Sequence, residues 1–153
     1  MEALRRAHSY EEPAYDVYPL RPTFSRVGDG RLGKLPRPTP LAEIVQSVRE
    51  RLHAGTVQFV AEAGRVVERA AIVCGAGGTL LDDALAAGAD LFLTGEMRFH
   101  DCLRAQARGA SVVLPGHYGS ERFAMDSMAR SLQALLPELQ VWASQREHDP
   151  LQQ

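Results

Sequence analysis

The chain has 153 residues, 45% hydrophobic and 24% charged, which suits one globular domain with its own core and excludes a disordered chain. Its 17 Lys and Arg residues are interspersed among 19 Asp and Glu, so the net charge of -2 offers no basic stripe for direct nucleic-acid binding and no polybasic patch for a membrane. The N-terminus carries no apolar core of signal-peptide length and no apolar run approaches a membrane span, so we expect a cytoplasmic protein.

Residues 1–38 differ in composition from the rest of the chain. Their turn-forming residues are Pro13, Pro19, Pro22, Pro36, Pro38, Gly28, Gly30 and Gly33. Proline and glycine interrupt regular structure, and only residues 14–20 form a strand-like run. We therefore expect this N-terminal segment to bury little apolar surface by itself.

One helix and one hairpin are predicted next. Apolar residues at helical spacing predict a helix over residues 39–53, with Thr39 as its N-cap. They are Leu41, Ile44, Val45, Val48 and Leu52. Two β-branched runs, 56–61 and 66–74, then flank the turn at 62–65 and predict a hairpin whose second strand continues into a parallel sheet.

From residue 80 onward, predicted helices and strands alternate. The helices are expected at 80–87, 97–108 and 120–136, and the strands at 90–94, 111–114 and 139–142. This alternation predicts an α/β fold with a mainly parallel sheet flanked by helices. We assign residues 39–146 to this domain and residues 147–153 to a polar tail.

The two cysteines, Cys74 and Cys102, are too few and too far apart for a disulfide framework. We expect both to be reduced, with Cys74 as a small buried apolar residue.

A histidine and a carboxylate stand four residues apart where the helix at 120–136 begins. His117 follows the strand at 111–114, and Ser120 is the candidate N-cap. At helical spacing His117 and Glu121 face the same way and could hold one metal ion. Nitrogen and oxygen donors suit a divalent transition metal such as zinc, manganese or iron. Alternatively, Glu121 complements the positive end of the helix and His117 is a polar turn residue.

Two further loops leave strands at the same predicted edge of the sheet, where functional groups of open α/β sheets gather. Glu96, His100 and Asp101 could lie beside a metal or a substrate, or could serve the helix dipole and packing. A glycine loop after the strand 66–74 could cradle an anion on its backbone N–H groups, or could only let the chain turn sharply into a helix. Its residues are Gly75, Gly77, Gly78 and Thr79. No catalytic residue is assigned.

Together these loops resemble the C-terminal half of a known family. Residues 94–101 (Thr-Gly-Glu-Met-Arg-Phe-His-Asp) followed by 116–121 (Gly-His-Tyr-Gly-Ser-Glu) are similar to motifs of the NIF-three family, the NGG-one-interacting-factor-three-like dinuclear metal proteins. The glycine loop fits the same half. Residues 7–20 resemble the end of a ferredoxin-like domain inserted in longer bacterial members, and residues 30–35 resemble the segment that leads back into the core.

The resemblance implies half of a NIF-three-like α/β domain, with residues 1–38 as a remnant of the inserted domain plus a linker. It also implies a toroidal, often hexameric homo-oligomer with a two-metal centre facing its interior. The family's last two metal ligands fall on His117 and Glu121. Members are often labelled type-two GTP cyclohydrolase homologues, which implies a metal-dependent hydrolase for a small phosphorylated or nucleotide-like ligand.

The family's other ligands, a pair of histidines and an aspartate, come from its first half, and this sequence begins after that half. It could pair with a chain carrying the N-terminal half, keep one weaker metal, or be a relic without metal. A different hypothesis is a non-catalytic assembly or regulatory module whose sheet edge and first 38 residues bind another chain. Residues 8–13 also resemble a motif of the trimeric divalent-cation-tolerance proteins, although the alternation after Leu80 does not suit their fold.

Overall fold

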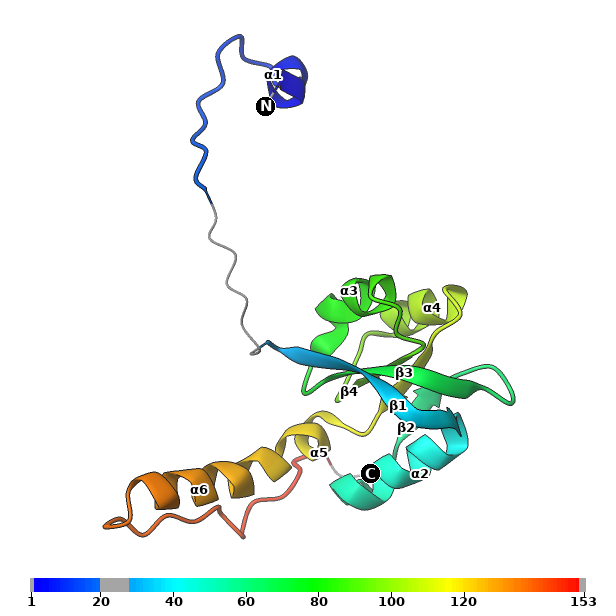
Figure 1. Ribbon diagram of the computed structural model, residues 1–153, viewed down its shortest axis with the longest axis vertical. Coiled ribbons are helices and arrows are strands. Elements are labelled where there is room, and N and C mark those ends of the chain that lie inside the picture. The colour runs from blue at the N-terminus through cyan, green and yellow to red at the C-terminus, as the bar shows by residue number, and fades with distance from the viewer. Residues whose placement is uncertain (1, 20–27, 152–153) are drawn as a thin grey trace.

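The computed structural model describes residues 2–19 and 28–151, and it contains a five-stranded sheet with helices on both faces (Figure 1). The helices are α1 (Glu2–Ala7), α2 (Leu41–Leu52), α3 (Leu81–Ala86), α4 (Phe99–Ala107), α5 (His117–Glu121) and α6 (Phe123–Leu135), with a 3-10 turn η1 (Gly77–Leu80) before α3. The strands are β1 (Gly30–Pro40), β2 (Gln58–Val60), β3 (Val66–Val73), β4 (Leu91–Thr94) and β5 (Ser111–Leu114).

The sheet has the strand order β1-β3-β4-β5-β2. Its centre is parallel, because β4 pairs in parallel with both β3 and β5, and its two edges are antiparallel. The predicted α/β fold with helices flanking a parallel centre is therefore confirmed. The parallel pairs place the carboxyl ends of β3, β4 and β5 at one edge of the sheet.

Two apolar layers hold the helices to the sheet. Successive strand residues point to opposite faces, so Phe92 packs with residues of α3 and α4, whereas Leu91 and Leu93 pack with residues of α2. The first layer contains Ala71, Val73, Leu81, Ala89, Phe92, Cys102, Ala105 and Val112. The second contains Leu41, Val45, Val57, Val67, Leu91, Leu93 and Val113.

The N-terminal part of the prediction needs two corrections. Residues 30–40 form the edge strand β1, which crosses the proposed boundary at residue 38 and pairs with β3. An edge strand tolerates Pro36 and Pro38 because one side of its backbone has no ladder partner, and the register shifts between Lys34 and Thr39. The predicted strand at 14–20 is wrong for residues 14–19, which have no regular structure, and Leu20 lies outside the described residues.

The predicted helix at 39–53 is confirmed as α2, although its N-cap is not Thr39. The Thr39 side chain lies in β1 and donates a hydrogen bond to the Arg37 carbonyl oxygen, and Pro40 precedes the helix. The predicted hairpin is wrong. Because β1 and β4 already occupy both sides of β3, β2 pairs instead with β5, with Phe59 opposite Val113.

The second half of the prediction is confirmed for α3, β4, α4 and β5 to within about two residues. The expected helix at 120–136 is two helices, α5 and α6, and α5 begins at His117. Ser120 is therefore inside α5 and buried, not an N-cap. Residues 139–142 form no strand; they run back along α6, where Gln133 donates to the Leu139 carbonyl and accepts from the Val141 N–H (Figure 1).

The cysteines also differ from expectation in one respect. Both are free thiols, but Cys74 is exposed and only Cys102 is buried. Cys74 comes one residue after β3 ends, at the rim of the sheet, whereas Cys102 lies on the face of α4 that packs against the sheet.

Phe92 offers a test of the core. Phe92→Ala removes a fully buried ring from the layer under α3 and α4, and we expect a loss of about 3 to 5 kcal/mol in the free energy of unfolding. Phe59→Ala, at a ring that is 57% exposed, is the matched control and should cost far less. Urea denaturation followed by circular dichroism measures both, and equal losses would contradict the assigned packing.

Candidate metal-binding edge

The turns after β3, β4 and β5 are bonded to one another through their backbones. The Glu96 N–H donates to the Gly75 carbonyl over 3.1 Å, and the Gly116 N–H donates to the Gly95 carbonyl over 3.0 Å. These bonds continue the pairing of the parallel strands past their ends. The three turns predicted to share one edge therefore do so.

Two buried hydroxyls fix the turn at Gly75. Thr94 Oγ1 donates to the Gly75 carbonyl and accepts from the Gly77 N–H, both over 2.9 Å. Ser120 Oγ accepts from the Gly75 N–H over 2.9 Å and donates to the His117 carbonyl over 2.8 Å. Because both hydroxyls are almost completely buried, these hydrogen bonds replace ones that water would otherwise supply.

Glycine occupies two positions where α5 and its side chains approach these turns closely. Gly75 has φ of 65°, and a Cβ there would collide with the Glu121 carboxylate and lie 3.3 Å from His117 Nε2. A Cβ at Gly95 would lie 2.5 Å from Ser120 Oγ and 2.9 Å from the His117 Cα. The glycines thus let α5 carry its two polar side chains directly over the sheet edge.

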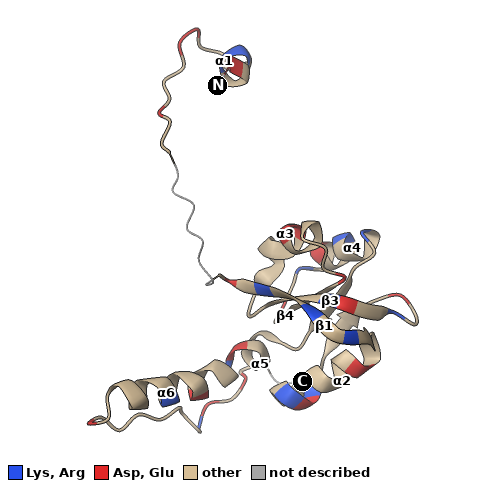
Figure 2. Cartoon of the chain, viewed as in Figure 1, with Lys and Arg blue, Asp and Glu red and all other residues tan. Residues whose placement is uncertain are grey.

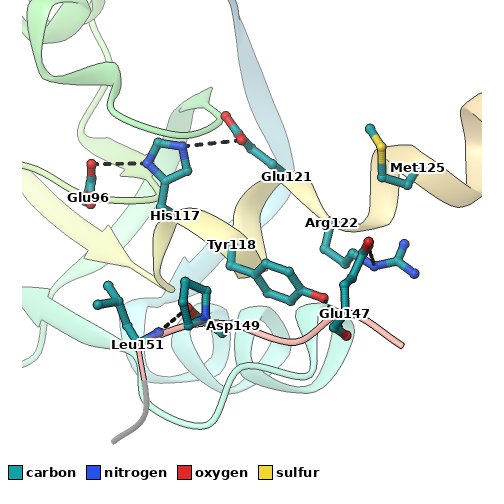
Figure 3. Close-up of a pocket in the computed structure, with 10 residues that line it drawn as sticks. Glu96, His117, Tyr118, Glu121, Arg122, Met125, Glu147, Asp149 and Leu151 are labelled. Atoms are coloured by element: carbon teal, nitrogen blue, oxygen red, sulfur yellow. Dashed lines mark hydrogen bonds and ion pairs between the residues drawn. The ribbon is translucent and has the colours of Figure 1, made fainter. Parts of the chain in front are cut away.

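The His117 ring lies between two carboxylates (Figure 3). Its Nδ1 is 3.1 Å from Glu96 Oε1, and its Nε2 is 3.3 Å from Glu121 Oε2. All three side chains are about half exposed, so an ion or small molecule can reach them. The sequence spacing correctly placed His117 and Glu121 on one side of a helical turn, and Glu96 joins them from the neighbouring loop.

The carboxylates favour the protonated imidazole when no metal is bound. The hydrogen bond with Glu96 is the largest cause that raises the pKa of His117; partial burial opposes it, and the charges of Glu121 and Glu96 add to it. A raised folded-state pKa stabilises the fold below the unfolded-state value of 6.5, and this contribution disappears as the pH rises through the folded-state pKa.

His100 and Asp101 lie apart from that cluster. His100 is exposed, and its ring makes an edge contact with Phe99 at 6.1 Å between centroids. The Asp101 carboxylate pairs with Arg104 over 3.1 Å and lies beside Gly78. Asp101 and Glu96 line a cavity of about 600 Å³ together with the glycine loop residues Gly78 and Thr79 and with Ala76, Met97, Arg98 and Arg104.

A second cavity, of about 490 Å³, opens beside His117 and Glu121. Its other walls could not be predicted from the sequence. They come from Tyr118 and Arg122, from Met125 on α6, and from residues 147–151, the segment predicted to be only a polar tail (Figure 3). Arg122 attaches that segment, since its Nε lies 2.7 Å from Glu147 Oε1 and its guanidinium donates to the Ser144 carbonyl over 2.5 Å.

Within residues 2–19 and 28–151, no group of three or more His, Cys, Asp and Glu side chains is arranged to hold a metal ion. His117 and Glu121 are therefore a pair of candidate ligands without a third in this part of the chain. None of the described helices is both long enough and apolar enough to span a membrane, and charged residues lie on α2, α3, α4 and α6 (Figure 2).

The protein is an α/β protein whose sheet is parallel at its centre. The carboxyl edge of that sheet carries a glycine turn and a histidine-glutamate pair. Residues 4–150 match the profile of the Duf34/NIF3 (NGG1p interacting factor 3) family, and the chain belongs to that family.

Curated relatives of the chain are longer than it is. It is 31% identical over 154 aligned residues to the "GTP cyclohydrolase 1 type 2 homolog" of Bacillus subtilis, an alignment that covers 98% of this chain and 41% of the relative. The protein of the same name from Mycobacterium tuberculosis is 34% identical over 124 residues, which cover 79% of this chain and 33% of that protein. The chain thus spans less than half the length of these relatives.

Solved structures give the same picture of the fold. A Bacillus cereus protein related to NIF3 superposes with a TM-score of 0.78 at 32% identity, over 98% of this chain and 42% of that one. A Staphylococcus aureus protein superposes with a TM-score of 0.76 at 26% identity, over 99% of this chain and 44% of that one.

Ser120 tests the hydrogen bonds between the turns. Ser120→Ala leaves the Gly75 N–H buried without its acceptor, so we expect a loss of about 1 to 3 kcal/mol in the free energy of unfolding. Ser131→Ala removes a hydroxyl from the exposed surface of α6 and should change stability by less than about 0.5 kcal/mol. Chemical denaturation measures the free energy of unfolding of both variants. Similar losses of stability would mean that the hydrogen bonds of Ser120 contribute little.

Glu96 tests the electrostatics of the edge. In chelator-treated protein, Glu96→Gln removes the main cause of the raised pKa, so NMR titration of the imidazole should show a lower His117 pKa. The variant should lose stability relative to the parent protein below the unfolded-state pKa of 6.5, and this difference should vanish above the folded-state value. Glu62→Gln, in the turn before β3, should move neither quantity. An unchanged His117 pKa in the Glu96 variant would refute this arrangement.

Proposed function

We propose that this chain contributes His117 and Glu121 to a divalent transition-metal site, and that the assembled protein is a metal-dependent hydrolase of small molecules. The observation that carries the proposal is that the His117 imidazole and the Glu121 carboxylate approach to 3.3 Å at an accessible edge, directly over the turn at Gly75. This pairing is what two ligands of one ion require.

The donor set fits zinc, manganese or iron, which accept imidazole nitrogen and carboxylate oxygen. Gly75 adds to the fit, since any larger residue would fill the space beside both side chains. Two donors are fewer than such ions usually take from protein. The remaining donors would come from outside the described residues, either from a chain that carries the family's N-terminal half or from a second copy in a ring-shaped, often hexameric assembly.

Glu96 has a role that differs from that of a ligand. Its carboxylate faces Nδ1 of His117, so it would keep a proton on that nitrogen when Nε2, on the side of Glu121, binds a metal. Removal of a carboxylate that orients a metal-binding histidine in this way typically weakens metal binding by about 10- to 100-fold. Glu96 is therefore proposed as the positioning residue of the site.

The hydrolase proposal draws on the relatives as well as on the edge. Their name, "GTP cyclohydrolase 1 type 2 homolog", supports a reaction on a phosphorylated or nucleotide-like molecule. A bound metal pair would supply activated water and polarise the substrate. The residues of this chain would bind and orient the substrate in the two cavities that meet at Glu96. We propose two side chains as groups on the substrate side: Asp101, beside the glycine loop, and His100, on the exposed side of α4. We also propose a cytoplasmic location.

A specific observation favours a second candidate, a non-catalytic assembly module. Helix α6 has no buried residue, although one side of it is apolar. The exposed apolar side chains on and just after this helix are Phe123, Met125, Met128, Leu132, Leu135 and Leu136. An isolated helix of this length is marginal in water, so a partner chain would be expected to cover it.

Metal content tests the first candidate. Protein purified without chelator or histidine tag should contain a transition metal by elemental mass spectrometry, and His117→Ala combined with Glu121→Ala should abolish it while circular dichroism stays unchanged. Glu96→Gln should weaken metal binding by about 10- to 100-fold. His100→Ala is the matched histidine control and should retain the metal, because His100 lies outside the His117 cluster.

Retention of the metal by the double variant would refute the ligand assignment. An oligomer that chelation does not dissociate, in protein that contains no metal, would instead favour the assembly module. Light scattering with and without chelator provides that measurement.

A further inference from the structure

Helix α6 projects from the domain and has one covered and one uncovered side. In Figure 1 it extends away from the sheet, and the chain that follows it runs back along it. Gln133 holds that returning chain by two hydrogen bonds, one to the Leu139 carbonyl and one from the Val141 N–H. The helix residues that face the returning chain are Asp126, Ala129, Arg130, Gln133 and Ala134. The returning chain therefore lies along the side of α6 that carries its charged residues.

The opposite side of α6 carries apolar residues at the spacing of a helix-pairing seam. Four of them follow one another by three, four and three positions, the a/d pattern of helices that pack side by side. They are Met125, Met128, Leu132 and Leu135. Leu136 and Leu139 extend the row past the end of the helix. These six residues, here called the α6 stripe, are all exposed within the part of the chain that the structure describes.

The residues that border the α6 stripe suit a second helix of the same kind. Ala124, Ala129 and Ser131 are small and uncharged, so two such helices can approach closely without repulsion between like charges. The charged residues of α6, Asp126 and Arg130, lie on the other side. An acidic or basic partner would find no opposite charge on the stripe, whereas an identical apolar stripe is complementary to it.

The exposed area of the stripe is sufficient for a dimer of modest stability. Its residues are between 39% and 75% exposed. Together they expose about as much surface as three fully exposed residues, on the order of 500 Å² in each copy and 1,000 Å² for two copies, which is about the lower limit for a specific interface. A reversible dimer is therefore expected.

We propose that two copies of this chain pair through their α6 stripes, with the two helices antiparallel. This alignment brings Met128 of each copy against Leu132 of the other, and Met125 against Leu135. The rest of the domain is attached at the N-terminal end of α6, so antiparallel helices place the two domains at opposite ends of the pair (Figure 1). Antiparallel helix dipoles also attract one another.

This inference names the partner for the apolar face on which the second candidate function rests, and it does not require a bound metal. It also has a consequence for the candidate site. Because Met125 lines the 490 Å³ cavity beside His117, pairing places the second copy at the edge of that cavity.

A matched pair of leucine variants tests the interface. Sedimentation velocity of the full chain from about 2 to about 200 µM, with and without chelator, should show a concentration-dependent equilibrium between monomer and dimer. Leu132→Glu places a charge in the seam and should weaken dimerisation by at least about tenfold. Leu103→Glu is the control, since Leu103 is 46% exposed on α4 and Leu132 is 40% exposed on α6. It should leave the dimer unchanged, and circular dichroism should show both variants folded.

Cross-linking tests the antiparallel register. In a Cys74→Ser background, which removes the exposed native thiol, Met128→Cys protein is mixed with Leu132→Cys protein and oxidised. The mixture should form disulfides between the two variants faster than either variant forms them with itself, because position 128 of one copy faces position 132 of the other. Faster cross-linking of each variant with itself would overturn the antiparallel arrangement.

Three further results would overturn the pairing: a chain that remains monomeric up to about 200 µM, equal effects of the two leucine variants, or a dimer that Leu132→Glu leaves intact. A dimer that chelator dissociates and Leu132→Glu does not would be bridged by metal, and it would also refute pairing through α6. Metal content tests the metal-site proposal separately, so the two proposals can fail independently.

Discussion

The candidate site depends on how closely the backbone turns after β3 and β4 approach helix α5. A side chain at Gly95 would collide with the His117 Cα, so α5 could not lie where it does; at Gly75, where φ is positive, a Cβ would displace the Glu121 carboxylate. Once the turns are in contact, Thr94 and Ser120 satisfy backbone groups that are cut off from water. Two small residues and two hydroxyls thus determine where the ionisable side chains lie. The polar chemistry at the surface rests on buried packing.

The sequence was sufficient to predict the central part of the fold. In β4 and β5 the apolar runs are short and nearly continuous, as is typical of strands buried on both faces, and the amphipathic helix α4 lies between them. The edges could not be predicted from such patterns. β1 contains three prolines and two glycines and is stabilised by its pairing with β3, and β2 pairs with a strand that comes much later in the chain. Residues 139–142 have strand-like side chains, but hydrogen bonds to Gln133 on α6 hold them instead.

Part of the candidate site could be predicted from the sequence because it depends on local spacing. The spacing of His117 and Glu121 is a local property of one helical turn, so the sequence carried it directly. The position of the His117 ring between Glu96 and Glu121 also depends on the parallel pairing of β4 with β5. The alternation of helices and strands predicted that pairing in outline. No local pattern indicates that Arg122 attaches residues 147–151 to the cavity, because those contacts join segments more than twenty residues apart. Ser120 was assigned the wrong role because its partner, Gly75, lies forty-five residues earlier.

All the contacts that connect the three turns lie between Gly75 and Glu121, on consecutive strand-turn-helix units. The edge is therefore built from one continuous stretch of the chain. Sequence inserted before β1 or added after α6 need not pass through it, so gain or loss of whole neighbouring domains can leave the geometry of the edge intact. Relatives more than twice as long as this chain can then share its fold over almost its full length.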